Sequence, residues 1–498
     1  MSALALGQSA SKAFNGIGLL ISWMIIAGAA LLVGIAARPH AASALPSFAR
    51  QTGQPCGACH TGFPQLTPYG REFKLRGYTA GGGFDARFGE PGWVPPLSAQ
   101  LIGSFTHTGA PQDNTGINIS PNNNTIFQEA SVWYGGAITD HVGMMLQGDY
   151  INPITPGFGM AKHQFNWDML DLRYSNTASV GNLDVVYGAT LNNQIGIQDV
   201  WNSVPAWSFP FVASTLAPTP AARTLIEGAF TQRVLGLGAY AWINSFLYLE
   251  ASGYQTLSPN AQDSLGIDPM GAPGTINQIA PYFRAALERT QGNHSLEFGG
   301  FVFLSNVNPQ PWNFAGINPL TGLAAGKDRY TDIGIDSQYQ YNGGKYWITL
   351  RGSYIHENQQ LNASSMLPID PTGTFGSNPT DQLNSFKASA SFAYGTDHTV
   401  VLTGGYFNVW GTPDVALYGP GTMANSISSS PNSDGWIAEI SYIPFGMSRS
   451  PIYPWFNARI GLQYIWYNKF NGATTNFDGM GTNAKDENTL FAYVQLTF

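Results

Sequence analysis

Residues 457–468 read NARIGLQYIWYN, and apolar side chains occupy every second position from Ala458 onward. The apolar face consists of Ala458, Ile460, Leu462, Tyr464 and Trp466. The positions between the first four of them carry Arg459, Gly461 and Gln463. A repeat of two residues with one apolar and one polar face predicts a half-buried β-strand. The same alternation returns in residues 333–341, 346–354 and 386–394.

The composition suits a protein built from many strands and turns. Only 10% of the 498 residues are charged, whereas 58 are glycine and the loops are rich in Asn, Ser, Thr and Pro. A mean hydropathy of -0.08 argues against a bundle of apolar membrane helices but suits a barrel in which alternate residues face lipid. Tyr or Trp stands at the ends of the alternating segments, as in the aromatic girdles of outer-membrane barrels. A soluble sandwich would also alternate, but it would not usually carry such belts.

The lengths of the connections predict the number of strands. Tight turns near residues 139–141, 176–181, 242–245, 290–294, 341–345, 395–398 and 446–454 alternate with long loops near 108–125, 151–165, 191–224, 255–277, 306–327, 358–381, 411–433 and 470–487. We therefore predict that residues 97–498 form an antiparallel outer-membrane β-barrel of about sixteen strands. The last strand, which ends at Phe498, should close against the first strand near 97–105. Tight turns should lie in the periplasm and long loops outside the cell.

The first 44 residues resemble an export signal. Lys12 precedes an apolar run over residues 17–36, and Ala42-Ser43-Ala44 provides an A-x-A cleavage site. The run is longer than usual, so an uncleaved anchor helix is the alternative. We predict a signal peptide over residues 1–44 and an outer-membrane location in a Gram-negative bacterium.

Both cysteines of the chain lie in one short motif, CGACH, at residues 56–60. The C-x-x-C-H spacing is typical of a c-type haem attachment site. Cys56 and Cys59 would each form a thioether with one porphyrin, and His60 would be the proximal ligand of the iron. A zinc site would need more soft ligands, and a redox dithiol would not need His60. The sequence therefore predicts one covalent haem c.

Residues 45–96 are few for a self-sufficient domain that buries a porphyrin. A barrel of this size has room for a plug, and a haem held in the lumen could be approached from both sides of the membrane. We therefore predict that residues 45–96 form a monohaem cytochrome c segment that plugs the barrel.

No second axial ligand stands out beyond His60, because residues 61–96 contain neither His nor Met. The predicted lumen-facing candidates are Met169 and Met145, and His163 lies near the end of a loop. A new amino terminus at residue 45, water or Lys74 are further options, although Lys74 is more simply expected as a solvated surface residue.

The segment FARQTGQPCGACHTGFPQLTPYGREFKLRGY, residues 48–78, placed before a predicted barrel, resembles the fused outer-membrane cytochrome–porins that act as iron oxidases. The motif covers about thirty residues, and the rest of the likeness lies in architecture and length. The resemblance implies one haem c, Fe(II) outside the cell as electron donor, and a periplasmic cytochrome c or copper protein as acceptor. It also implies that Cys56 and Cys59 carry the haem and that His60 binds the iron.

Two other functions stay open from the residues alone. One is a porin for solute diffusion whose haem plug is structural or sensory, and the other is an exported haem enzyme with an open iron position. Acidic loop residues could attract Fe²⁺, but none shows metal-ligand spacing; they are Asp113, Asp199, Asp268, Asp414, Asp478 and Asp486. The net charge of -8 without a basic cluster excludes nucleic acid as an expected partner.

Overall fold

A computed structural model describes the chain from residue 45 to residue 498, with gaps. The described residues are 45–81, 93–111, 122–150, 165–201, 203–204, 208–267, 273–309, 326–366, 377–395, 398–445 and 450–498. The predicted signal peptide and His163 lie outside these residues.

The described elements are mainly strands. The strands are β1 (Leu97–Thr108), β2 (Asn124–Ala137), β3 (Val142–Tyr150), β4 (Phe165–Val180), β5 (Leu183–Asn192), β6 (Val234–Ile243), β7 (Leu247–Thr256), β8 (Gly274–Ile276), β9 (Ala280–Gln291), β10 (His294–Pro309), β11 (Asp328–Asn342), β12 (Tyr346–Gln360), β13 (Thr380–Tyr394), β14 (Val400–Gly411), β15 (Ser433–Tyr442), β16 (Asn457–Lys469) and β17 (Thr489–Thr497). The helices are α2 (Pro46–Thr52), α3 (Cys56–Cys59), α4 (Pro68–Leu75), α5 (Pro259–Ser264) and α6 (Val415–Tyr418), with 3-10 turns η2 (Ser364–Met366) and η3 (Ala484–Glu487).

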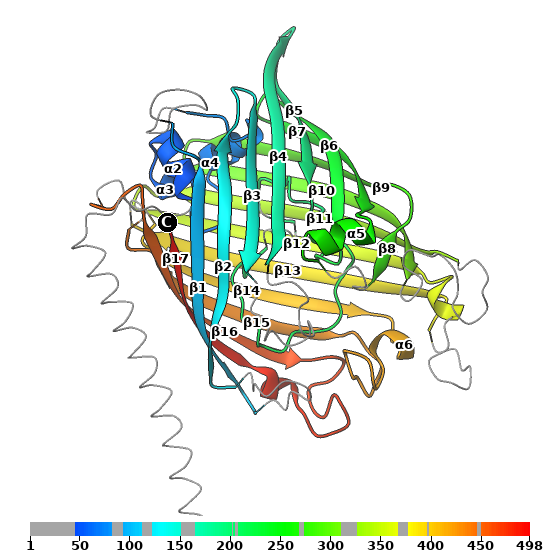
Figure 1. The fold of residues 1–498 in the computed structure, drawn as a ribbon. Helices are drawn as coiled ribbons and strands as arrows, with labels where there is room; N and C mark the ends of the chain where they lie inside the picture. The colour runs from blue at the N-terminus through cyan, green and yellow to red at the C-terminus, as the bar shows by residue number, and fades with distance from the viewer. Residues whose placement is uncertain are drawn as a thin grey trace, which may run out of the picture.

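The strands form one closed antiparallel barrel (Figure 1). Apart from the short β8, consecutive strands pair with each other, and β1 closes the ring by pairing with β17 from Gln100↔Thr497 to Thr108↔Thr489. The short β8 pairs with the far end of β10, where β9 no longer does, so β8 and β9 together act as one interrupted strand. The described residues therefore form a sixteen-stranded barrel, which confirms the predicted antiparallel barrel and its strand number.

The two faces of each strand meet different surroundings. In β16, Ile460, Leu462 and Tyr464 are exposed on the outer face, whereas Arg459 and Gln463 are buried on the inner face. Exposed aliphatic and aromatic side chains alternate with buried polar ones in the same way along β10 and β11. An apolar outer surface with a polar interior is the pattern of a barrel in the outer membrane.

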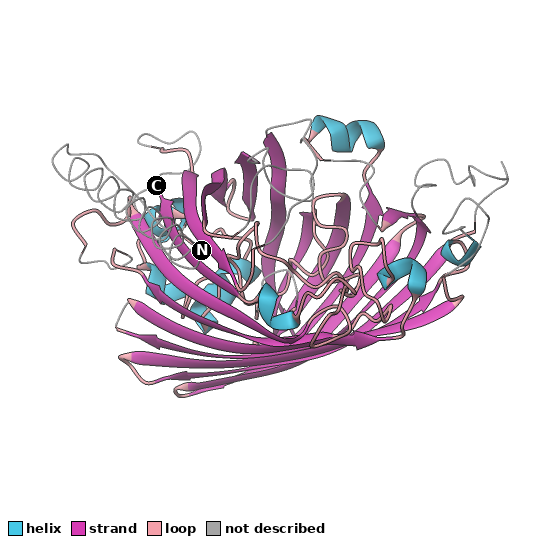
Figure 2. Cartoon of the chain, turned by 90° about the horizontal axis from the view of Figure 1, so that it is seen from below, coloured by secondary structure: helices cyan, strands magenta, loops and turns pink. Residues whose placement is uncertain are grey.

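The two ends of the barrel differ in their connections. One end carries tight turns, such as the two-residue turn between β4 and β5, and the other carries long loops that include α5, α6 and η3. Helices α2, α3 and α4 lie at the tight-turn end, and α5 and α6 lie at the opposite end (Figure 1). Figure 2 shows helices enclosed by the curve of the strands.

The sequence predicts an outer loop near residues 191–224, but the described residues of the connection between β5 and β6, residues 193–233, run inside the barrel. Its apolar side chains, such as Phe230, pack against Tyr282 and Phe303 of the inner wall. Buried polar groups fix it to several strands: Ile226 N donates to Asp332 of β11 at 2.8 Å, and Gln463 of β16 donates to the Val212 carbonyl at 3.1 Å. This lumen loop therefore crosses between distant parts of the wall.

The helices of the described residues all fall short of the length and hydropathy needed to span a bilayer.

Candidate functional site

The C-x-x-C-H motif forms one helical turn at the tight-turn end of the barrel. Helix α2 ends at Gly53, whose φ of 69° is the left-handed conformation that glycine adopts at little cost. After a short extended stretch, α3 contains only Cys56–Cys59, and the His60 N–H donates to the Cys56 carbonyl at 2.9 Å. The two thiols, which are not joined in a disulfide, and the imidazole therefore belong to one compact turn.

Helix α4 packs directly against this turn. Thr67 caps α4 by accepting from Gly70 N at 3.1 Å, and its hydroxyl donates to the Ala58 carbonyl at 2.5 Å. The Thr67 N–H also donates to the Cys59 carbonyl at 2.8 Å. A Cβ added to Gly70 would lie 2.2 Å from that carbonyl oxygen, so only glycine lets the helix approach so closely. The sequence TPYG at residues 67–70 thus fixes the shape of the cysteine turn.

The imidazole of His60 is oriented by its own chain. Nδ1 lies 3.3 Å from the Pro64 carbonyl oxygen, so Nδ1 carries the proton and donates it. Nε2 then keeps its lone pair, and this is the arrangement that second-shell carbonyl groups give to metal-binding histidines. Burial lowers the pKa of His60 to about 4, which keeps the ring neutral at physiological pH. His60 is therefore prepared to bind a metal through Nε2.

A largely apolar cavity adjoins Cys56, Cys59 and His60. The segment contributes Phe48, Leu66 and Phe73 among others, and the barrel wall contributes side chains from β2, β3 and β16; the wall residues include Trp133, Met145, Ala458 and Arg459. Its total empty volume is about 1370 Å³, part of which is open to solvent. Burial also raises the pKa of the Cys59 thiol to about 12, so this thiol stays protonated.

The cavity contains buried polar groups that lack a partner. Arg459 is 9% exposed, and its Nε and Nη1 make no hydrogen bond within the described residues. The cavity therefore combines apolar walls, two thiols, a prepared imidazole and unused donors. This set fits a porphyrin, which has an apolar ring, vinyl groups, an iron and carboxylate arms.

Residues 45–81 are attached to the inner wall through polar contacts. The Arg71 guanidinium forms a buried ion pair with Glu288 of β9 and donates to Gln340 of β11 at 2.7 Å. Gln65 donates to Ser391 of β13 at 2.7 Å, and the Tyr78 hydroxyl donates to Asp171 of β4 at 2.6 Å. The segment is therefore held by strands from around the barrel, near the tight turns.

Comparison with known proteins finds solved structures of similar fold. No family model matches this chain, and no curated protein matches it. The barrel resembles Pseudomonas putida OprB in its high-pH structure, with 13% identity and a TM-score of 0.44 over 81% of this chain and 94% of that one. It also resembles Salmonella typhi OmpF in complex with daunomycin, with 11% identity and a TM-score of 0.41 over 81% and 97%. The anion-selective porin from Comamonas acidovorans has 11% identity and a TM-score of 0.39 over 80% and 98%.

The predicted second ligands of the iron differ in position. Met145 is buried and lines the cavity. Met169 is buried in the same apolar cluster but does not line the cavity. Lys74 is not a surface residue as expected, because it is 5% exposed and its amine donates to the carbonyls of Ile197 and Asp199. The lumen loop, rather than solvent, therefore holds this amine.

His398, in the turn between β13 and β14, is a residue of the site that sequence reasoning missed. It is buried, lines the cavity, and donates from Nδ1 to the His60 carbonyl at 2.5 Å. Its ring also lies edge-on to Trp347, with ring centroids 6.0 Å apart. A single histidine in a tight turn gives no periodic signal, so only the fold reveals its contact with the motif.

Four of the acidic residues expected in loops have local structural partners. Asp199 is fully buried and lies 3.4 Å from Arg284, whereas Asp414 caps α6. Asp478 accepts from Thr482, and Asp486 belongs to the capping box of η3. Asp113 and Asp268 lie outside the described residues. Within the described ranges, no group of three or more His, Cys, Asp or Glu side chains is arranged to hold a metal ion.

Proposed function

We propose that this protein is a fused cytochrome–porin that carries one haem c inside the barrel and moves single electrons across the outer membrane. Fe(II) outside the cell is the donor, and a periplasmic cytochrome c or copper protein is the acceptor. Cys56 and Cys59 would hold the haem covalently, and His60 would bind its iron. The observation that carries the proposal is the oriented His60 beside two thiols at an apolar cavity within the lumen.

The chain would position and insulate the redox group. Bound haem c supplies a centre that accepts and releases one electron at a time. The Pro64 carbonyl holds the His60 ring with Nε2 free, and Phe73, Trp133 and Met145 give the cavity an apolar lining. A low-dielectric, tightly packed surround keeps the iron ligand in place and tunes the potential. Each electron taken from Fe(II) leaves Fe(III) outside.

The position of the segment supports access from the periplasm. Residues 45–81 lie near the tight turns, which face the periplasm in barrels of this type. Tyr69 of α4 is 42% exposed, and Glu72 and Arg76 form an exposed ion pair on the same helix. A soluble carrier could therefore approach α4 without crossing the barrel.

A porin for solute diffusion remains the second proposal, and the fold favours it. A closed sixteen-stranded barrel with a polar inner face is an architecture shared with porins. The described lumen, however, contains both residues 45–81 and the lumen loop, which bonds to β1 through Thr106 and Ser214 and to β11 and β16. These segments leave less room for solutes than an open pore would.

One set of measurements separates these functions. Purified protein would be tested for haem that survives denaturation, then mixed without oxygen with Fe(II), and finally with an oxidised periplasmic cytochrome or copper protein. We expect covalent haem, reduction by Fe(II) and reoxidation by the carrier. The double variant Cys56→Ser/Cys59→Ser is the control and should show none of these.

Two further outcomes would favour the other functions. Solute flux through proteoliposomes that is the same in the wild type and in the double cysteine variant would favour the porin. Rapid binding of CO or cyanide by the reduced or oxidised protein would indicate an open iron position. Absence of covalent haem would overturn the electron-transfer proposal outright.

A further inference from the structure

The cavity wall beside the cysteine motif carries a polar anchor that the proposed haem attachment does not use. This anchor is Arg459 of β16, which is 9% exposed and lines the cavity together with Cys56, Cys59 and His60. The Arg459 guanidinium carbon lies 6.0 Å from the centre of the Phe63 ring, and that ring centre lies 5.4 Å from His60. Arg459, nearly four hundred positions from His60 in the chain, is thus separated from this proposed iron ligand by the ring of Phe63.

Only one edge of the Arg459 guanidinium is used. Nη2 donates to Glu439 Oε1 of β15 at 2.6 Å, and Glu439 also accepts from Gln463 at 2.9 Å and from Tyr493 at 3.1 Å. Among the described residues, Nε and Nη1 have no hydrogen-bond partner, and Arg459 is the only side chain there with two such buried atoms. Buried donors without a partner cost about 1–3 kcal/mol each, and more when charged. Two unpaired donors beside a cavity indicate a ligand that accepts hydrogen bonds.

A second unpaired group lies next to Arg459. Gln495 of β17 is its direct cross-strand neighbour and lines the same cavity, and its Oε1 has no donor in the part of the chain that the structure describes. The Gln495 amide nitrogen instead donates to Gln100 at 2.6 Å. The wall therefore offers a small polar patch, made of Arg459 and Gln495, in otherwise apolar surroundings.

We infer that Arg459 binds a propionate carboxylate of the haem through one of its free donors, Nε or Nη1, an inference that rests on the proposed haem attachment. A guanidinium N–H forms a charge-assisted hydrogen bond with a carboxylate, and a carboxylate needs such donors when it is buried. Water held by the carboxylate can supply the donor that Gln495 Oε1 requires. Arg459 is thus a positioning residue that ties the redox group of the amino-terminal segment to the barrel wall.

This contact also sets the direction of an effect on the reduction potential. A positive charge beside the carboxylate disfavours the ferric form, which carries one more positive charge than the ferrous form. Loss of Arg459 should therefore lower the midpoint potential of the haem. A change of about tenfold in the reduction equilibrium corresponds to 59 mV for one electron, and we expect a shift of that order.

The test uses purified full-length holo-protein and a redox titration of the haem, with resonance Raman bands of the propionates as a second readout. Arg459→Gln should lower the midpoint potential by an amount that corresponds to a change of about tenfold in the reduction equilibrium, and it should shift the propionate bands. Arg459→Lys should have a smaller effect on both readouts. Arg351→Gln is the matched control, because Arg351 is a buried lumen arginine that lines a different cavity. If Arg459→Gln fails to fold, Glu439→Gln/Arg459→Gln removes both charges together and leaves no unpaired carboxylate.

The outcomes separate a failure of the proposed function from a failure of the role inferred for Arg459. If the wild type carries no covalent haem, the proposed function and this inference both fail. If the haem is present and Fe(II) reduces it, but the Arg459 variants keep the potential and the propionate bands of the Arg351→Gln control, the inference alone fails. A change in thermal stability without a change in either readout would likewise mark Arg459 as a purely structural partner of Glu439.

Discussion

His60 owes its orientation to a carbonyl group only four residues further along the chain. The C-x-x-C-H spacing predicts which residue follows the thiols, but the Pro64 carbonyl decides which ring nitrogen is left for a metal. Gly70 acts at the same scale, because its missing side chain lets α4 contact the Cys59 carbonyl. Single atoms therefore determine whether this short segment can hold a cofactor.

Met145 is the residue that we expect to act as the second ligand of the haem iron. Met145→Leu should abolish methionine ligation and lower the midpoint potential, because Met ligation raises it. Absorption spectra of the ferric holo-protein and a redox titration would measure both effects. Met169→Leu is the matched control, since Met169 is buried in the same cluster but does not line the cavity. Equal spectra for both variants and the wild type would contradict this assignment.

Helix α4 is the element that attaches the amino-terminal segment to the barrel. Two of its residues bind different parts of the chain. Arg71 pairs with Glu288 of the barrel wall, and Lys74 donates to the lumen loop. Both contacts are buried, so both depend on a complete set of partners. The helix therefore joins three parts of the chain that are far apart in sequence.

Replacement of Arg71 should release this helix. Arg71→Met leaves Glu288 buried without its cation, which typically costs about 3–5 kcal/mol. Protease cleavage within residues 45–81 of the folded barrel should become faster by a large factor. Arg76→Met is the control, because the Arg76–Glu72 pair is exposed and contributes at most about 0.5 kcal/mol. Similar cleavage rates for the two variants would show that the ion pair does not hold the segment.

Lys74 should make the attachment of α4 depend on pH. Burial lowers its pKa from 10.5 to about 7 in the folded chain. Between these values the unfolded chain binds more protons, so the free energy of unfolding should rise with pH, by up to about 1.4 kcal/mol per unit. Urea titrations at pH 7 and pH 9 would measure this rise in the wild type. Lys74→Met should remove it, and an equal rise in that variant would assign the effect to another group.

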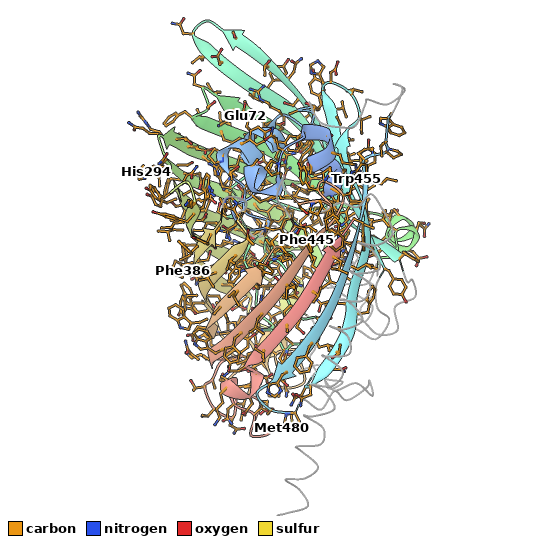
Figure 3. The ribbon with its side chains drawn as sticks, turned by 90° about the vertical axis from the view of Figure 1, so that its left-hand side faces the viewer. Glu72, His294, Phe386, Phe445, Trp455 and Met480 are labelled. Carbon is orange, nitrogen blue, oxygen red and sulfur yellow. The ribbon has the colours of Figure 1, made fainter. Side chains whose placement is uncertain are left out.

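The whole molecule has two distinct ends. Figure 3 places Glu72 and His294 toward one end and Met480 at the other. Met480 is 77% exposed in the long connection between β16 and β17, whereas His294 begins β10 directly after a tight turn. The apolar outer face between these ends is the part that lipid covers. The barrel thus presents the α4 end and the long loops to different compartments.

Labelling of intact cells would test this orientation. A membrane-impermeant maleimide should label Met480→Cys, because long loops face outward in barrels of this kind. It should not label Gly292→Cys, which lies in the tight turn between β9 and β10. Lysed cells provide the control, since both variants should then react. Labelling of Gly292→Cys alone in intact cells would show that the barrel has the opposite orientation, which would contradict the proposed direction of electron flow.

Much of the barrel was predictable, because the lipid and the lumen impose a two-residue repeat on each strand. Residues 457–468 illustrate this, since Ile460 and Leu462 face outward and Gln463 faces inward as the pattern indicates. The interruption between β8 and β9 was not predictable, because it depends on local backbone geometry at Gln278, where φ is 72°. Strand periodicity carries no such information.

The contents of the lumen were harder to predict than its wall. The inward course of residues 193–233 was missed, although buried apolar residues such as Val204, Leu225 and Phe230 in a supposed outer loop are a signal that could have revealed it. The contacts of Arg459, His398 and Lys74 were also beyond the sequence, because each joins positions that are distant along the chain. Short motifs show chemistry, whereas only the closed fold shows its neighbours.

The position of the half-buried Cys56 and Cys59 beside β16, β17 and the His398 turn has a consequence for biogenesis. These late parts of the chain lie beside a motif that precedes the first strand, so attachment of haem as proposed would need the motif while it is still accessible. Under the proposed function, attachment of haem would then precede insertion into the outer membrane. A chain that inserts before haem is attached would then keep its motif without haem. Chaperones that delay insertion would therefore favour a functional product.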